Sequence, residues 1–175
     1  TQKYTAATIA EKLDYYGSWL ELSSSSEYAY ITVYSLNKYL AKTLEVVESM
    51  IKEPVFPEKE LHTILDTNIQ QYLVNTSKVD FLAHRGLLQA LYGTQHPCGQ
   101  IVVEEDYHAI IPEVLRDFYG RHYHSGNCSI FLSGKVTEDI IRRVTGAFGT
   151  PFGQYQLKAS KPIFSFVAVP EKRIF

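Results

Sequence analysis

The sequence has little cysteine and almost no net charge, and each shortage excludes a class of protein. Two cysteines among 175 residues, Cys98 and Cys128, are too few for a disulfide scaffold or a four-cysteine zinc site. The 17 basic and 19 acidic side chains leave a formal charge of −2. Nucleic-acid-binding domains usually carry a basic excess, so we expect no nucleic-acid partner.

Long apolar runs are also missing. No stretch approaches the roughly 20 consecutive apolar residues that a membrane helix requires, so the sequence predicts no membrane span. Hydrophobic residues still make up 45% of the chain. A chain of this length can bury roughly 70% of its unfolded surface, which is enough for one substantial core.

The residues that are present predict helices in runs beside a few strands. Apolar residues at helical spacing, with Thr5, Asn37 and Thr137 as candidate N-caps, indicate helices. The expected helices span 6–16, 37–51, 57–75, 79–92, 112–119 and 137–148. The expected strands are Ser18–Ser23, Tyr28–Leu36, Asn127–Ser133 and Pro162–Val169, the first two forming an antiparallel pair. This order predicts an α+β fold with a small, mainly antiparallel sheet packed by a layer of helices.

Three segments follow from where the pattern changes. Residues 1–148 form the α+β domain, and 149–160, which hold Pro151 and Gly153, are a linker. Residues 161–175 are a strand that begins or completes another unit. The period-two and helical patterns also predict a core, made of Trp19, Leu22, Ile31, Val33, Leu40, Leu44 and Leu65.

Motifs that carry hydrolytic or metal chemistry are weak. His122 and His124 are the only close histidine pair, and their place near a helix end favours surface or capping roles over metal binding. Cys98 beside His96 is compatible with a thiolate nucleophile, but Pro97 between them tends to splay the two side chains apart. From these residues alone we expect no catalytic group.

Six phrases, in order over residues 4–148, resemble the pitrilysin/insulinase family of zinc metallopeptidases, which includes the mitochondrial processing peptidases. They are Tyr4–Gly17, Trp19–Ser26, Tyr28–Leu36, Glu53–Leu61, Leu91–Gly99 and the pair Val114–Tyr123 with Phe131–Val136. The resemblance implies a half-domain of that family, truncated at its N-terminus. Active members bind zinc through an inverted histidine-x-x-glutamate-histidine helix, which would lie upstream of Thr1.

The resemblance also implies that this copy is not catalytic. The family's third zinc ligand is a glutamate on a long helix, and its position falls on Gln71. A second family glutamate, seven residues earlier, falls on Ile64. A neutral amide is a poor substitute for an anionic zinc ligand, and isoleucine cannot orient one. We therefore expect no metal site in this chain, with zinc held by a partner half or elsewhere in the parent protein.

The family's architecture implies a role for such a copy. Its members form a clamshell of two similar halves, in one chain or two, so this chain is expected to come from the non-zinc half that forms the wall of a peptide-binding chamber. Tyr28 and Tyr30 are candidate contacts for a peptide or unfolded protein substrate, or else cross-strand packing partners of Trp19 and Leu22. As a fragment the chain is expected to form homo-oligomers.

Two alternatives stay open at the level of the sequence. The chain could belong to an active zinc endopeptidase whose zinc helix lies outside it, an alternative that Gln71 disfavours. It could also belong to a structural subunit that resembles the core proteins of the respiratory cytochrome complex and has no proteolytic role.

Overall fold

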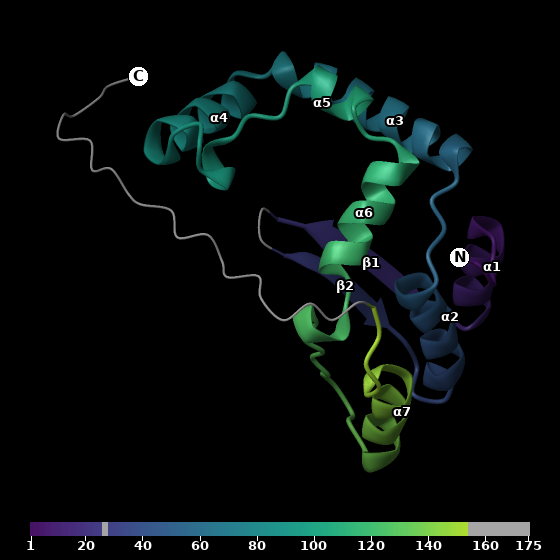
Figure 1. Ribbon diagram of the computed structural model, residues 1–175. Coiled ribbons are helices and arrows are strands. Elements are labelled where there is room, and N and C mark those ends of the chain that lie inside the picture. The colour runs from purple at the N-terminus through teal and green to yellow at the C-terminus, as the bar shows by residue number, and fades with distance from the viewer. Residues whose placement is uncertain (26–27, 154–175) are drawn as a thin grey trace. The chain divides into compact units, whose positions relative to one another are not determined.

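The computed structural model describes residues 1–25 and 28–153, which divide into two compact units. The first comprises residues 1–62 and 110–153, and the second comprises residues 63–109 (Figure 1). The described residues form seven α-helices and a two-stranded antiparallel sheet, so the predicted α+β class is confirmed. Within this described part, no helix is both long and apolar enough to cross a bilayer.

Helix α1 (Ala6–Tyr15) begins and ends where its capping residues predict. The Thr5 side chain accepts a hydrogen bond from the Thr8 backbone N–H, as an N-cap does. At the other end Gly17 adopts a φ of 57°, and the N–H groups of Gly17 and Ser18 donate to the carbonyls of Asp14 and Leu13. This is a Schellman motif, which turns the chain directly into the first strand.

Strands β1 (Trp19–Ser24) and β2 (Ala29–Tyr34) form the predicted antiparallel pair. Trp19 lies opposite Tyr34, Leu22 opposite Ile31, and Ser23 opposite Tyr30. Because side chains alternate between faces along a strand, this register places Trp19, Tyr30 and Tyr34 on one face of the sheet and Leu22 and Ile31 on the other.

A buried cluster of hydroxyl groups joins the hairpin to helix α2 (Leu40–Lys52). The Ser18 and Thr43 hydroxyl oxygens lie 2.6 Å apart, and the Ser35 hydroxyl lies 3.0 Å from that of Thr43. Thr43 is fully buried and also donates to the Tyr39 carbonyl at 3.3 Å. Each hydroxyl is therefore satisfied, as burial requires.

Most of the buried apolar side chains of the first unit lie on α2 and on α7 (Glu138–Phe148), which pack against each other. They are Val46, Val47, Ile140, Val144 and Ala147. The Lys52 ammonium donates to the Ala147 carbonyl at 2.6 Å, which places a cation at the negative end of the α7 dipole. Helix α1 packs beside α2 (Figure 1). Helix α6 (Pro112–His122) is tied to α2 by the Tyr119 hydroxyl, which donates to the Ile51 carbonyl.

The second unit is helical. It contains most of α3 (Glu58–Thr76), then α4 (Val79–Tyr92), a short 3₁₀ turn η1 (Pro97–Gly99) and α5 (Glu104–His108). The α4 limits coincide with the prediction, and Gly93–Gly99 is a loop that contains η1. In that turn His96 Nδ1 accepts a hydrogen bond from the Cys98 backbone N–H at 3.1 Å, so this imidazole caps the turn.

The predicted core is partly wrong. Leu65 is buried, while Val33, Leu40 and Leu44 are half-buried. Trp19 is 68% exposed, and Leu22 and Ile31 are exposed as well. The hairpin alternates as a half-buried strand does, but in the described part of the chain neither of its faces is closely covered. On α2 the buried stripe runs through Thr43, Val46 and Val47, because the hydroxyl cluster and α7 fix which side of the helix faces inward.

The strand predicted at Asn127–Ser133 is also wrong. Asn127 ends the 3₁₀ turn η2 (Ser125–Asn127), and residues 128–133 form no regular structure. Phe131 is 91% exposed. β-branched and aromatic residues favour a strand only where a neighbouring strand supplies backbone partners, and no described segment does so here. The Pro162–Val169 strand and most of the 149–160 linker lie outside the described residues, so that division stays a prediction.

An ion pair near the N-terminus makes stability depend on pH. The Lys3 ammonium and the Tyr4 hydroxyl donate to Glu45 Oε1 at 2.7 and 3.1 Å, and these hydrogen bonds lower the pKa of Glu45. Because the pKa is lower in the folded chain, the stabilisation is present above the unfolded value of 4.5 and is lost as the pH falls through the folded value.

Glu45→Gln should therefore flatten the dependence of the urea midpoint on pH below 4.5. An equally steep dependence in the variant would contradict this assignment.

Candidate functional site

One face of the β1–β2 hairpin carries four aromatic side chains. Trp19 and Tyr34 lie directly opposite each other, with ring centroids 6.2 Å apart. Tyr30 lies four positions before Tyr34 and therefore on the same face of β2. Tyr28 lies just before β2, and its ring centroid is 6.1 Å from that of Tyr30. The exposed fractions of Tyr28 and Tyr30 are 53% and 52%. The result is an exposed row of aromatic rings on the regular backbone of the hairpin.

The register shows what the two predicted tyrosines contact. Tyr30 lies opposite Ser23, whose small side chain leaves the ring exposed, and Leu22 points to the other face. The Tyr28 ring packs against the Tyr30 ring. The register thus places Trp19 directly opposite Tyr34 and Leu22 directly opposite Ile31.

Both strands also present an unpaired edge, since β1 and β2 have only each other as neighbours among the described residues. An open edge exposes backbone N–H and C=O groups that can pair with an added extended segment. Aromatic side chains beside such an edge supply apolar contact that does not depend on a particular sequence. The hairpin is thus suited to hold an extended peptide.

Sequence reasoning missed Trp19 and Tyr34 as members of this face, although a signal was present. Tyr28, Tyr30 and Tyr34 all occupy even positions of one strand-like run, and a strand places alternate residues on one face. The period-two pattern of the first strand predicts Trp19 in the core instead. Only the register, which sets Trp19 opposite Tyr34, shows that it extends the exposed row.

Gln71 lies in the second unit, on α3, and faces solvent. Its side-chain Nε2 donates to Asn75 Oδ1 at 3.1 Å, one helical turn away. Ile64, where the resemblance expects the family's second glutamate, is 57% exposed. A neutral amide engaged with a second amide does not fit a zinc ligand set.

The histidine side chains are not gathered with other possible metal ligands in the part of the chain that the structure describes. His122 packs its ring against Phe118, with centroids 4.5 Å apart, at the end of α6. Across residues 1–25 and 28–153, no three histidine, cysteine, aspartate or glutamate side chains gather in a way that could hold a metal ion.

Comparison with known proteins gives three relatives at low identity. The chain is 26% identical over 171 residues to mitochondrial-processing peptidase subunit alpha-1 of Dictyostelium discoideum. It is 24% identical over 152 residues to the uncharacterized zinc protease YmxG of Bacillus subtilis, and 23% identical over 143 residues to an uncharacterized zinc protease of Rickettsia felis. The chain is a distant relative of zinc proteases. The resemblance inferred from its sequence phrases is thus confirmed.

The matches cover most of this chain but a minor part of each relative. They include 95%, 86% and 81% of the chain, and 26%, 37% and 34% of the respective relatives. The chain therefore spans about a quarter to just over a third of their length. No protein-family model matches it.

Proposed function

We propose that this chain is part of a zinc-peptidase-like protein and forms, in the half that lacks zinc, the wall of a chamber that binds extended peptides. The single observation that supports this most is the exposed aromatic face of the hairpin beside an open strand edge. Tyr28 and Tyr30 are the proposed peptide contacts. The similarity to a processing peptidase subunit supplies the class of ligand, a peptide or unfolded protein.

Catalysis is assigned to another half, in the same chain or in a partner subunit. Gln71 stands at the position where the family's third zinc ligand is expected, and it is hydrogen-bonded to Asn75. The zinc that the relatives' names imply is therefore proposed to sit in that other half. The exposed hairpin face and edges also favour association of the isolated chain with itself, so homo-oligomers remain our prediction.

Peptide binding by the hairpin can be tested on the chain itself. A fluorescein-labelled, unstructured peptide of about 20 residues is titrated with the wild type and with Tyr28→Ala and Tyr30→Ala, and fluorescence anisotropy gives the Kd. Each substitution removes apolar contact area from the proposed peptide-binding face of the hairpin. Each should therefore raise the Kd several-fold, which corresponds to roughly 1 kcal/mol of binding free energy. Tyr15→Ala is the matched control, since Tyr15 is 81% exposed at the end of α1 and outside the hairpin.

The outcomes separate the proposal from its alternatives. Unchanged binding in both hairpin variants would contradict the peptide-contact role of Tyr28 and Tyr30. No measurable binding by the wild type would favour the purely structural subunit. Stoichiometric zinc in the purified chain, lost on Gln71→Ala, would favour the active endopeptidase instead.

A further inference from the structure

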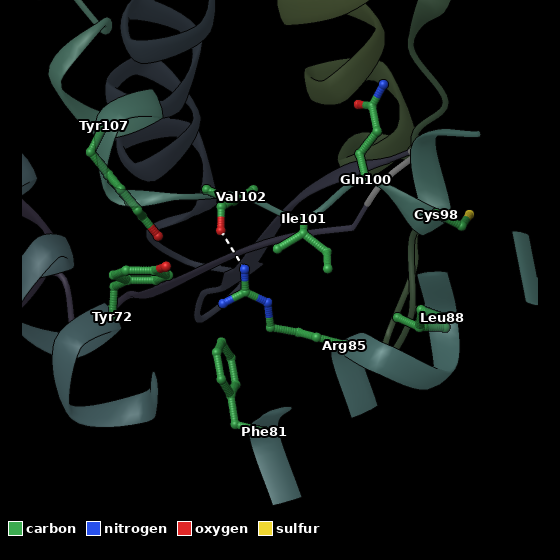
Figure 2. Close-up of a pocket in the computed structure, with 9 residues that line it drawn as sticks. All are labelled: Tyr72, Phe81, Arg85, Leu88, Cys98, Gln100, Ile101, Val102 and Tyr107. Carbon is green, nitrogen blue, oxygen red and sulfur yellow. Dashed lines mark hydrogen bonds between the residues drawn. The ribbon is translucent and has the colours of Figure 1, made fainter. Parts of the chain in front are cut away.

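The second unit contains a pocket of about 290 Å³ between α3, α4 and the segment that follows η1. Its walls are mainly aromatic and aliphatic, with one cationic side chain, Arg85 (Figure 2). Tyr72 comes from α3, Phe81 and Leu88 from α4, and Tyr107 from α5. All of these residues belong to the second unit, so the pocket lies within one compact body.

Helical spacing brings Arg85 into this pocket. Phe81, Arg85 and Leu88 stand at i, i+4 and i+7 of α4, so they share one face of the helix. The segment after Gly99 runs back along that face, and the Val102 carbonyl accepts a hydrogen bond from Arg85 Nη2 at 2.7 Å. This bond fixes one end of the guanidinium (Figure 2).

Two aromatic rings hold the rest of the guanidinium in place. Its carbon lies 5.3 Å from the centroid of the Phe81 ring and 5.6 Å from that of Tyr72. The Tyr107 ring lies 5.7 Å from the Tyr72 ring, so two phenol groups stand at the same end of the pocket (Figure 2). Stacking of this kind restricts a side chain that otherwise has many rotamers, and so lowers the entropy cost of binding through it.

The charge of Arg85 is not balanced within the described part of the chain. Arg85 is half-buried, and no ion pair among the described residues includes it. A guanidinium has five N–H donors in a planar fork, and the Val102 carbonyl engages one of its nitrogens. The remaining donors match the two oxygens of a carboxylate, which pairs with arginine in a bidentate manner.

We propose that this pocket binds a carboxylate attached to an apolar or aromatic group. The single positive charge fits a monoanion, and the Leu88, Phe81 and Ile101 side chains fit the apolar part of the ligand. The volume is at the low end for ligand pockets, so it accepts one residue-sized group. Two sources share this chemistry: the C-terminal residue of a peptide, and an acidic side chain next to an apolar one.

Three short peptides test the proposal and separate its sources. The probes are acetyl-Ala-Ala-Phe with a free carboxylate, the same peptide with an amidated C-terminus, and acetyl-Ala-Phe-Glu amide, each titrated by calorimetry into the full chain. At least one carboxylate probe should bind about tenfold or more tightly than the neutral amide. The probe that does so identifies the source. Equal affinity of all three for the wild type overturns the proposal.

Arg85 variants decide whether the pocket is responsible. Arg85→Met keeps the apolar length of the side chain and should abolish the preference for the acid, while Arg116→Met, an exposed arginine of α6, should leave it unchanged. Retained preference in Arg85→Met with a native circular dichroism spectrum overturns the assignment. Should Arg85→Met unfold, Arg85→Lys decides: it keeps the charge but loses the planar fork, so acid binding should weaken severalfold, and unchanged binding overturns the proposal.

This inference does not rest on the proposed chamber function. It concerns the second unit, whereas Tyr28 and Tyr30 belong to the first. Tyr28→Ala and Tyr30→Ala should leave the preference for the acid probe intact, so failure of one proposal is visible without failure of the other.

Discussion

Ile140→Ala should lower the free energy of unfolding of the first unit by about 2–5 kcal/mol. Ile140 is 8% exposed and begins the buried stripe of α7, which continues through Val144 and Ala147 and packs against α2. Truncation to alanine removes three carbon atoms from this contact and leaves a cavity that the two helices cannot fully close. Urea denaturation followed by far-UV circular dichroism measures the change.

The adjacent residue supplies the control. Ile141 has the same side chain on the same helix but is 50% exposed, so Ile141→Ala should change stability by less than about 1 kcal/mol. The pair cancels differences in helix propensity, because both substitutions replace isoleucine by alanine in α7. Equal losses from the two variants would show that α7 does not bury the face that contains Ile140.

Most of the helices could be predicted because their signals are local, although α2 begins at Leu40 and is not capped by the expected Asn37. Thr5 and Thr137 cap their helices through their own side chains, and Gly17 ends α1 because it adopts a positive φ without strain. The limits of α4 follow from a break before Val79 and from Gly93 after Tyr92. Each of these signals depends on residues within one or two turns of the boundary, so the rest of the fold does not need to be known.

What depends on distant partners could not be predicted. The inward face of α2 is fixed by Ser18 and Ser35, which hydrogen-bond to Thr43, and by contacts with α7 about 100 residues later. The strand expected at residues 127–133 has suitable residues but no pairing partner in the described chain. Strand formation needs such a partner, whereas a helix satisfies its own backbone.

The two candidate sites differ in the same way. Tyr28 and Tyr30 could be found from the sequence, because residues two apart on a strand share a face. The arginine pocket could not be found, since it requires α3, α4 and the segment after Gly99 to converge on Arg85. The spacing of Phe81, Arg85 and Leu88 is visible in the sequence, but it equally describes an ordinary helix face until Val102 and Tyr72 are seen beside it.

That convergence depends on a close approach of the backbone at Gly99, which makes Gly99→Ala the most informative substitution in the second unit. Gly99 is buried, and a Cβ there would collide with the Gly93 carbonyl oxygen and lie 3.1 Å from Tyr92 Cβ. The colliding atoms are backbone or sit at the base of a side chain, so no rotamer change relieves them. We expect a loss of about 1–3 kcal/mol in unfolding free energy, the usual cost of overpacking.

Gly86→Ala is the same substitution in the same unit, but it should raise the unfolding free energy instead of lowering it. Gly86 lies inside α4, where a Cβ meets no atom within 4 Å, so alanine should stabilise the helix by roughly 0.5–1 kcal/mol through its lower backbone entropy. Thermal or urea unfolding of both variants measures the difference in sign. The turn at Gly99 leads into the segment whose Val102 carbonyl accepts the hydrogen bond from Arg85. Gly99→Ala should therefore also weaken acid binding by the pocket, whereas Gly86→Ala should not. Two variants that shift stability in the same direction would show that the chain does not close tightly at Gly99.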